Sequence, residues 1–88
     1  MQKAVARITN KRGLHARASA KIVEAAARFQ SEITIVKDGQ RVNARSIMGL
    51  MMLAASLGSE IALEAKGPDE EAAMTAMLAL IDAKFGEE

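Results

Sequence analysis

The segment GLHARASAKIVEAAARF, residues 13–29, decides how this chain folds. Its apolar residues recur at spacings of four, three and four: Ala18, Ile22, Ala25 and Phe29. Such spacings place side chains on one stripe of a helix. Most other positions in the segment are alanine or long polar residues with high helix propensity. The pattern therefore predicts a helix from Ala16 to about Phe29, with His15 at its N-terminal edge.

Segments on both sides of this helix alternate between apolar and polar side chains, which is the pattern of half-buried strands. They are residues 2–9, 32–37 and 60–66. Asp38-Gly39 is a strong signal for a two-residue hairpin turn. It predicts a short return strand over residues 40–43.

Two further helices are expected. Ser46 precedes the apolar run IMGLMMLAA, residues 47–55, and is well placed to cap a short helix. Gly67-Pro68 and the acidic residues after it predict the start of a last helix, which continues to a stop at Gly86. The order strand, helix, strand, strand, helix, strand, helix predicts an α+β open-faced sandwich. We expect residues 1–88 to form a single domain.

Composition excludes several classes of function. There is no Cys, which removes disulfides and thiolate nucleophiles, and the single His disfavours a metal site. The formal charge of +1 is spread along the chain, and the only aromatic residues are two Phe, so we expect no nucleic-acid partner. Neither a leader segment nor an apolar stretch of about 18 residues is visible, so we expect no membrane span and a cytoplasmic location.

His15 and Arg17 are the candidate functional residues. The first turn of a helix carries unpaired N–H groups and a partial positive charge, and both features favour phosphate. An imidazole at that turn is placed to attack phosphorus, and the Arg17 guanidinium to pair with phosphoryl oxygens. The residues alone allow a second interpretation, in which His15 merely begins a helix and Arg17 is solvated. From the residues alone, the conclusion is therefore limited to a candidate anion-binding site at His15 and Arg17.

Two motifs resemble a known family. GLHARASAK, residues 13–21, closely resembles the active-site segment of HPr, the histidine-containing phosphocarrier family of the bacterial phosphoenolpyruvate-dependent phosphotransferase system. ARSIMGLMML, residues 44–53, resembles the regulatory-serine segment of that family. Their separation, the hairpin signal and the last helix start also agree, so the resemblance covers essentially the whole chain. It implies a four-stranded antiparallel sheet covered on one face by three helices.

The resemblance also implies roles for individual residues. His15 is the residue phosphorylated, through Nδ1, and Arg17 contacts the phosphoryl group. Enzyme I is the implied donor and a IIA-type protein the acceptor, so the chain is a monomeric carrier with no cofactor, and not itself an enzyme. Ser46 is the implied target of HPr kinase/phosphorylase, although its sequence context is equally that of a helix cap.

A partner-binding surface is implied around the same helix starts. The residues expected on it are Ala16, Ala20, Ile47, Met48 and Met51. Of the six large apolar residues in the segment 47–53, we expect about four to face the core and one or two Met to remain exposed. Exposed Met would provide an adaptable contact surface for several partners.

Ala18 departs from the family pattern GLHARPA, which has Pro at this position. Ala18 retains a backbone N–H that Pro lacks. GLHARAS segments are similar to those of the nitrogen-related, regulatory arm of the system, which favours a regulatory phosphorelay over bulk sugar uptake.

Three alternatives remain open. The first is a protein-interaction module of the same fold that never carries phosphate. The second is a small domain that binds an anionic metabolite at the helix N-terminus. The weakest is an autonomous enzyme, because no general base, metal site or cleft is evident.

Overall fold

The computed structural model describes residues 1–87. Four strands and three helices follow one another in the predicted order: β1 (Gln2–Arg7), α1 (Ala16–Ala26), β2 (Glu32–Lys37), β3 (Gln40–Asn43), α2 (Ile47–Met52), β4 (Glu60–Lys66) and α3 (Glu70–Asp82). A 3-10 turn, η1 (Lys84–Gly86), ends the described chain. The bounds expected for β2, β3 and β4 are confirmed, whereas β1 ends two residues earlier than expected, at Arg7.

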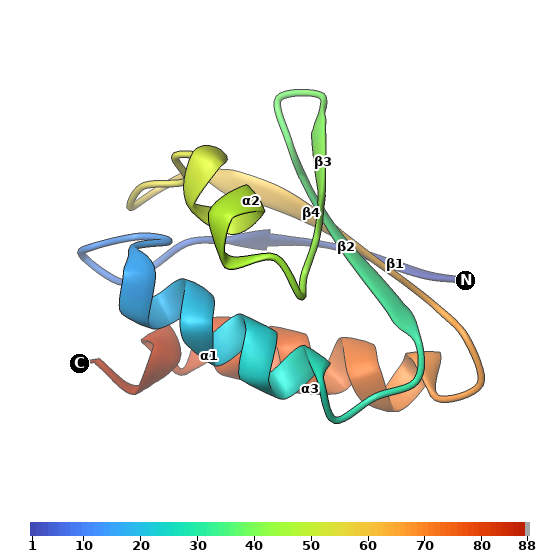
Figure 1. Cartoon of the computed structure of the whole chain (residues 1–88). Helices are drawn as coiled ribbons and strands as arrows, with labels where there is room; N and C mark the ends of the chain where they lie inside the picture. The colour runs from blue at the N-terminus through green and yellow to red at the C-terminus, as the bar shows by residue number, and fades with distance from the viewer. Residues whose placement is uncertain (88) are drawn as a thin grey trace.

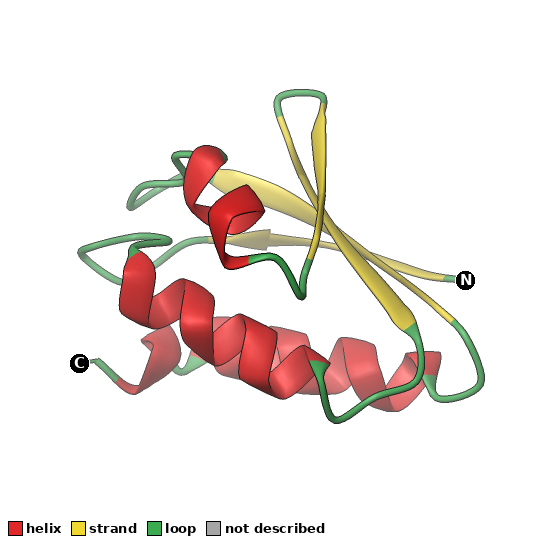
Figure 2. Cartoon of the chain, viewed as in Figure 1, coloured by secondary structure: helices red, strands yellow, loops and turns green. Residues whose placement is uncertain are grey.

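The strands form one antiparallel sheet in the order β1-β4-β2-β3. All three helices lie against one face of it, and the other face is open (Figures 1 and 2). The α+β open-faced sandwich expected from the sequence is therefore confirmed. Ion pairs also link the strands: Arg7 on β1 pairs with Glu60 on the neighbouring β4 at 3.7 Å, and Arg41 on β3 reaches across β2 to Glu64 on β4 at 2.5 Å.

The core fills the space between the sheet and the helices. Alternate residues of the strands supply one side of it, among them Ile33, Ile35, Ile61 and Leu63. The helices supply the other side with Ala18, Ile22, Ala73, Met77 and Ile81. Side chains alternate between the two faces of a strand. In β4 this alternation separates the buried Ile61, Leu63 and Ala65 from residues that are half-buried or exposed.

The first helix is shorter than expected and ends at Ala26. Beyond it the backbone tightens, with the N–H of Arg28 bonded to Ala25 and that of Phe29 to Ala26. The Arg45 guanidinium donates to the carbonyl of Phe29. These bonds satisfy carbonyls that a continuing helix would have used. Phe29 therefore lies after the helix and is half-buried.

The hairpin between β2 and β3 turns through Asp38 and Gly39, as expected. Their φ angles are +50° and +80°, and positive φ at both central residues is typical of the tight turn that suits twisted strands. The register places Lys37 opposite Gln40 directly across the turn.

Candidate functional site

His15 is the residue that caps α1. Its backbone is extended, and its side-chain Nδ1 accepts a hydrogen bond from the backbone N–H of Arg17 at 3.3 Å. Its carbonyl accepts from the N–H of Ser19 at 2.9 Å, the first bond of the helix. The expected position of His15 at the helix edge is confirmed. The ring nitrogen Nδ1 thus lies against the N–H groups of the first turn, where partial positive charge gathers.

The loop before His15 is docked on the segment that follows α2. The N–H of Leu14 donates to the carbonyl of Ala55 at 2.8 Å. Gly13 has a φ of +64°, and a Cβ at this position would lie 2.3 Å from the same carbonyl oxygen. Only glycine combines this backbone angle with so close an approach. The loop therefore reaches His15 in one defined path.

The other ring nitrogen of His15 meets the C-terminal segment. Nε2 is hydrogen-bonded to Oε2 of the Glu87 carboxylate. The second carboxylate oxygen accepts from Nδ2 of Asn10 at 3.0 Å, and the same Nδ2 donates to the carbonyl of Gly13 at 2.9 Å. The hydrogen bonds from Asn10 and then from His15 hold the pKa of the Glu87 carboxyl below its usual value. An ionised carboxylate only accepts hydrogen bonds, so Nε2 carries the ring proton and Nδ1 the free lone pair.

Sequence patterns gave no indication of Glu87 or Asn10 as site residues. Glu87 lies 72 residues from His15 along the chain, and 77 from Asn10. Neither residue belongs to a motif, so only the folded chain brings them together. Figure 1 shows the C-terminal end of the chain beside the N-terminal end of α1.

Arg17 is exposed on the first turn of α1. It lines a cavity of about 430 Å³ whose other lining residues are Lys11, Arg12, Lys21, Gly86 and Glu87. Four of the six lining residues are cationic, so the cavity favours an anion. The structure thus places the backbone N–H of Arg17 on the ring of His15 and the Arg17 side chain in this cavity.

Ser46 caps α2, which confirms its interpretation as a helix cap. Its hydroxyl oxygen accepts from the N–H of Gly49 at 3.0 Å, and its side chain is exposed. The Ser46 hydroxyl therefore holds the start of α2 from an exposed position.

The expectation that α2 buries most of its apolar residues is wrong. Only Leu50 and the capping Leu53 are buried. Met48 is 70% exposed, and Ile47 and Met51 are each 40% exposed. The helix has six residues and packs mainly on α1 and β3, so much of its surface is left uncovered.

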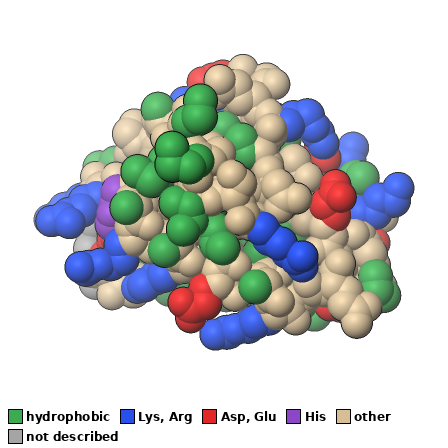
Figure 3. Space-filling model, in the orientation of Figure 1, with side chains coloured by type: hydrophobic (Ala, Val, Ile, Leu, Met, Phe, Trp, Pro, Cys, Tyr) green, Lys and Arg blue, Asp and Glu red, His purple; other side chains and the backbone are tan. Residues whose placement is uncertain are grey.

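We call the exposed residues of this region the apolar patch: Ile47, Met48, Met51, Met52 and Leu57. In Figure 3 apolar side chains gather on the face that α2 presents, next to the single His and several Lys and Arg. Ala16 and Ala20 are exposed on α1, which packs against α2. All five residues expected on a partner surface therefore reach solvent.

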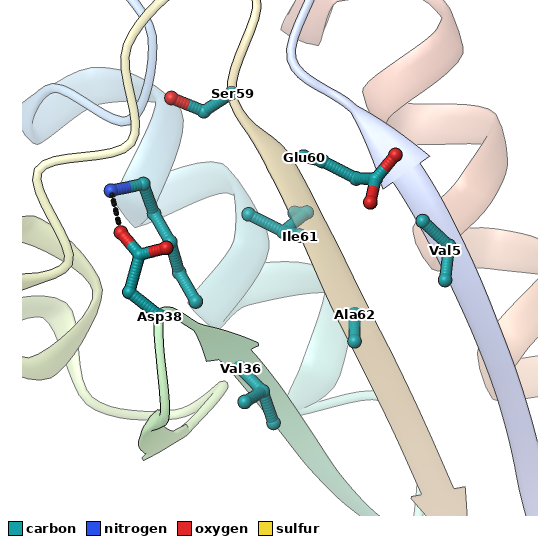
Figure 4. Close-up of a pocket in the computed structure, with 8 residues that line it drawn as sticks. Val5, Val36, Asp38, Ser59, Glu60, Ile61 and Ala62 are labelled. Atoms are coloured by element: carbon teal, nitrogen blue, oxygen red, sulfur yellow. Dashed lines mark hydrogen bonds and ion pairs between the residues drawn. The ribbon is translucent and has the colours of Figure 1, made fainter.

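A second hollow lies on the open face of the sheet, and neither His15 nor Arg17 lines it (Figure 4). It is lined by Val5, Val36, Lys37, Asp38, Ser59, Glu60, Ile61 and Ala62. Lys37 pairs with Asp38 across 3.0 Å, and the other polar groups are a hydroxyl and a carboxylate. Nothing in it resembles the anion-favouring surroundings of His15.

Residues 1–87 also lack two other features, a metal site and a membrane span. No group of three or more His, Asp or Glu side chains there is placed to hold a metal ion. None of the helices in that range is long and apolar enough to cross a membrane.

The family model and the related sequences all indicate the same protein family. Residues 2–83 match the family model described as PTS HPr component phosphorylation site. The chain is 56% identical to the phosphocarrier protein HPr of Cupriavidus necator, over 91% of this chain and 90% of that one. It is also 49% identical to the phosphocarrier protein NPr of Shewanella violacea, over 91% of this chain and 88% of that one.

Solved structures agree with the sequence comparison. HPr from Thermoanaerobacter tengcongensis superposes with a TM-score of 0.96 and 49% identity, over 100% of this chain and 99% of that one. A dimer of HPr from the same organism superposes with a TM-score of 0.79 and 48% identity, over 99% and 100% of the two chains. Relatives of this chain therefore include a dimeric form.

Proposed function

This chain belongs to the HPr family of phosphocarrier proteins, and we propose from that premise that it accepts a phosphoryl group on Nδ1 of His15 and passes it to a partner protein. The observation that carries the proposal is the contact between Nδ1 and the N–H of Arg17 at 3.3 Å. It leaves the reactive lone pair at the mouth of a helix N-terminus, where phosphoryl oxygens are favoured.

The transfer step uses groups that the site already holds. The Nδ1 lone pair attacks phosphorus, and the bond to the donor's leaving group breaks with its electron pair. As phosphorus replaces the N–H of Arg17 as the partner of Nδ1, that N–H becomes a donor for a phosphoryl oxygen. The Arg17 guanidinium, in the adjoining cationic cavity, neutralises the other oxygens. The P–N bond formed is reactive, which suits a second transfer to an acceptor.

We propose phosphorylated enzyme I, charged by phosphoenolpyruvate, as the donor and a IIA-type protein as the acceptor. Both would dock on the apolar patch together with Ala16 and Ala20. Docking there brings a partner's reactive group to His15, because α1 and α2 pack side by side. Since phosphoenolpyruvate is a metabolite of the cytoplasm, the carrier would act there.

Ser46 is proposed as a regulatory site for HPr kinase/phosphorylase. A phosphoryl group would add a charge of about −1.5 to −2 at the start of α2, a position that the helix tolerates. The same charge would stand next to Ile47 and Met48, so it would oppose docking on the apolar patch.

The oligomeric state proposed for the acting carrier is a monomer, since a partner needs free access to His15 and to the apolar patch. Light scattering after size-exclusion chromatography would test this. A stable dimer that still exchanges phosphoryl groups at full rate would contradict it.

The second candidate is a regulatory interaction module that carries no phosphoryl group. The exposure of the apolar patch favours it, because such a surface serves docking with or without transfer. A His15→Ala variant with full biological activity would support this second candidate.

The decisive experiment is intact-mass analysis after incubation with phosphoenolpyruvate and enzyme I. We expect the wild type to gain one acid-labile phosphoryl group and His15→Ala to gain none. No gain in the wild type with several enzymes I would contradict the carrier function. Adding IIA-type proteins of the sugar and nitrogen branches separately would then show which acceptor removes the group. We expect faster removal by the nitrogen-type acceptor.

A further inference from the structure

The end of the chain turns back sharply toward the start of α1. Lys84 and Phe85 have φ angles of +55° and +56°, a conformation that costs energy for residues other than glycine. The Phe85 side chain is fully packed in the core. Two successive residues in this conformation persist only where the surrounding contacts compensate for the cost.

Several contacts fix the turn in place. The Lys21 ammonium, on α1, donates to the carbonyl of Phe85. The N–H of Glu87 donates to the carbonyl of Lys84 at 3.0 Å. With its backbone held in this way, the side chain of Glu87 lies between Asn10 and His15 and is only 13% exposed.

We propose that Glu87 is a positioning residue for phosphoryl transfer: its carboxylate keeps the ring proton of His15 on Nε2 and holds the lone pair of Nδ1 at the first turn of α1, where the incoming phosphorus is received. The inference rests on the carrier function proposed above and extends its site to the C-terminal segment. In this arrangement the His15 imidazole is the nucleophile and the Glu87 carboxylate is the group that orients it.

The chemistry of the step gives the carboxylate a second effect. When Nδ1 bonds to phosphorus, the ring keeps its Nε2 proton and gains positive charge. The departing group takes the electron pair of the broken bond. A carboxylate hydrogen-bonded to Nε2–H stabilises that charge as it forms, and hydrogen bonds to ionised groups are stronger than those between neutral groups.

Asn10 makes the arrangement specific. One amide nitrogen donates both to the Glu87 carboxylate and to the carbonyl of Gly13, in the loop that leads to His15. Asn10 therefore fixes the position of the carboxylate relative to the loop that carries the His15 ring. A carboxylate that served only to tie down the C-terminus would not need its second oxygen on the ring.

The first readout is the ring itself, without any partner. The chain has a single His, so the ring nitrogens give one unambiguous set of NMR signals. The exchange measurement is made at about pH 9, above the pKa of about 6.5 that imidazole has in model peptides. We expect the Nε2-bound proton of the wild type to exchange slowly with water, at least about tenfold faster in Glu87→Ala, and at an intermediate rate in Glu87→Gln, whose amide oxygen still accepts.

The second readout is phosphorylation by phosphoramidate, a small donor whose P–N bond breaks with loss of ammonia. Intact mass follows the rate. We expect Glu87→Ala to react about tenfold more slowly than the wild type and Glu87→Gln to lie between them, in the range of a lost hydrogen bond to a charged group. Asp82→Asn removes one exposed charge near the same end of the chain and is expected to leave both readouts unchanged.

The outcomes separate the two proposals. Unchanged exchange and unchanged phosphorylation in Glu87→Ala would overturn the role of Glu87 while a reactive wild type upheld the carrier function. Equal losses in Asp82→Asn would also overturn it, since the effect would then be one of net charge. A wild type that takes no phosphoryl group from phosphoramidate or from enzyme I would contradict the carrier function itself, and the role of Glu87 with it.

Discussion

The hydroxyl oxygen of Ser46 accepts a hydrogen bond from the backbone N–H of Gly49 at 3.0 Å. The Ser46 carbonyl accepts from the N–H of Leu50, also at 3.0 Å. The residue proposed for regulatory modification is thus the one that begins the helix bearing most of the apolar patch. Its contribution to stability and its effect on docking are separable by substitution.

Replacing Ser46 with Ala should lower the free energy of unfolding by about 1 kcal/mol, because the N–H of Gly49 loses its side-chain acceptor. Ser46→Asp should retain near wild-type stability, since Asp caps helices well and its charge suits the N-terminus. Urea denaturation followed by circular dichroism would measure both. Equal stability of Ser46→Ala and the wild type would show that the cap contributes nothing.

Ser46→Asp should nevertheless slow phosphorylation of His15 by enzyme I, because it places a charge next to the apolar patch. Ser46→Asn is the matched control: it caps the helix without charge and should react at the wild-type rate. The initial rate of phosphoryl gain at a subsaturating concentration of carrier is the measurement. Equal rates for the Asp and Asn variants would remove the electrostatic explanation.

Met48→Ser should weaken docking of enzyme I while leaving phosphorylation by phosphoramidate unchanged. Met48 is 70% exposed on α2, so its loss affects a surface and leaves the core intact. A lost apolar contact of about 1 kcal/mol corresponds to about a fivefold rise in the KM for this protein as a substrate of enzyme I. Val5→Ser, at a 64% exposed site on the open face of the sheet, is the control. A rise in KM for both variants would argue against the apolar patch as the docking site.

Lowering the pH should remove stability through Asp69. Its carboxylate accepts from the Ser31 hydroxyl and from the N–H groups of Gln30 and Ser31, the latter two at 2.9 Å each. These bonds, the Ser31 hydroxyl foremost, lower the pKa of Asp69 in the folded chain. A depressed folded pKa gives stabilisation that is fully present above the unfolded value of about 3.9 and is lost as pH falls through the folded value.

The measurement is the free energy of unfolding of the wild type and Asp69→Asn at pH 6, 4 and 3. The advantage of the wild type should be largest at pH 6 and should shrink below about pH 4. Asp82→Asn, at an exposed carboxylate, controls for the loss of one charge. A constant difference between wild type and Asp69→Asn at all three pH values would contradict this assignment.

Gly13→Ala should be far more damaging than Gly39→Ala. Both residues have positive φ, which costs Ala about 1 to 2 kcal/mol. At Gly39 a Cβ would meet nothing within 4 Å, whereas at Gly13 it would lie 2.3 Å from the Ala55 carbonyl oxygen. We expect an additional loss of about 1 to 3 kcal/mol for Gly13→Ala, together with slower phosphorylation of His15. Denaturation midpoints and phosphoramidate rates would measure both, and equal losses at the two positions would refute the close approach.

Local sequence was sufficient for most of the architecture. Alternation predicted the bounds of β2 and β4, and Asp38-Gly39 predicted the hairpin that returns β3. The change to helical spacing after His15 predicted both α1 and the position of the ring at its first turn. These features depend on periodicity and turn preference, which act over a few residues. They can therefore be predicted from a short segment without the rest of the chain.

The end of α1 and the surface of α2 were beyond such patterns. The Arg45 guanidinium, 16 residues further along the chain, donates a hydrogen bond to the carbonyl of Phe29. The helical turn expected from Ala27 to Phe29 does not form, and α1 ends at Ala26. The composition of α2 indicates burial, yet its length and its two neighbours leave the apolar patch in solvent. How much of a helix is covered depends on what packs against it, and its own residues do not encode that.

The sequence by itself determined the order of the elements and the segments that form the sheet. It also singled out His15, Arg17 and Ser46 as the candidate functional residues. Only the tertiary structure decided that Glu87 and Asn10 belong with His15. The physical reason is chain distance: a turn or a helix start is fixed by neighbours along the chain, whereas the contact between Nε2 of His15 and the Glu87 carboxylate closes a separation of 72 residues. Phe85, two residues before Glu87, is buried in the core that the sheet and the helices form together, so the place of this end of the chain depends on the tertiary packing.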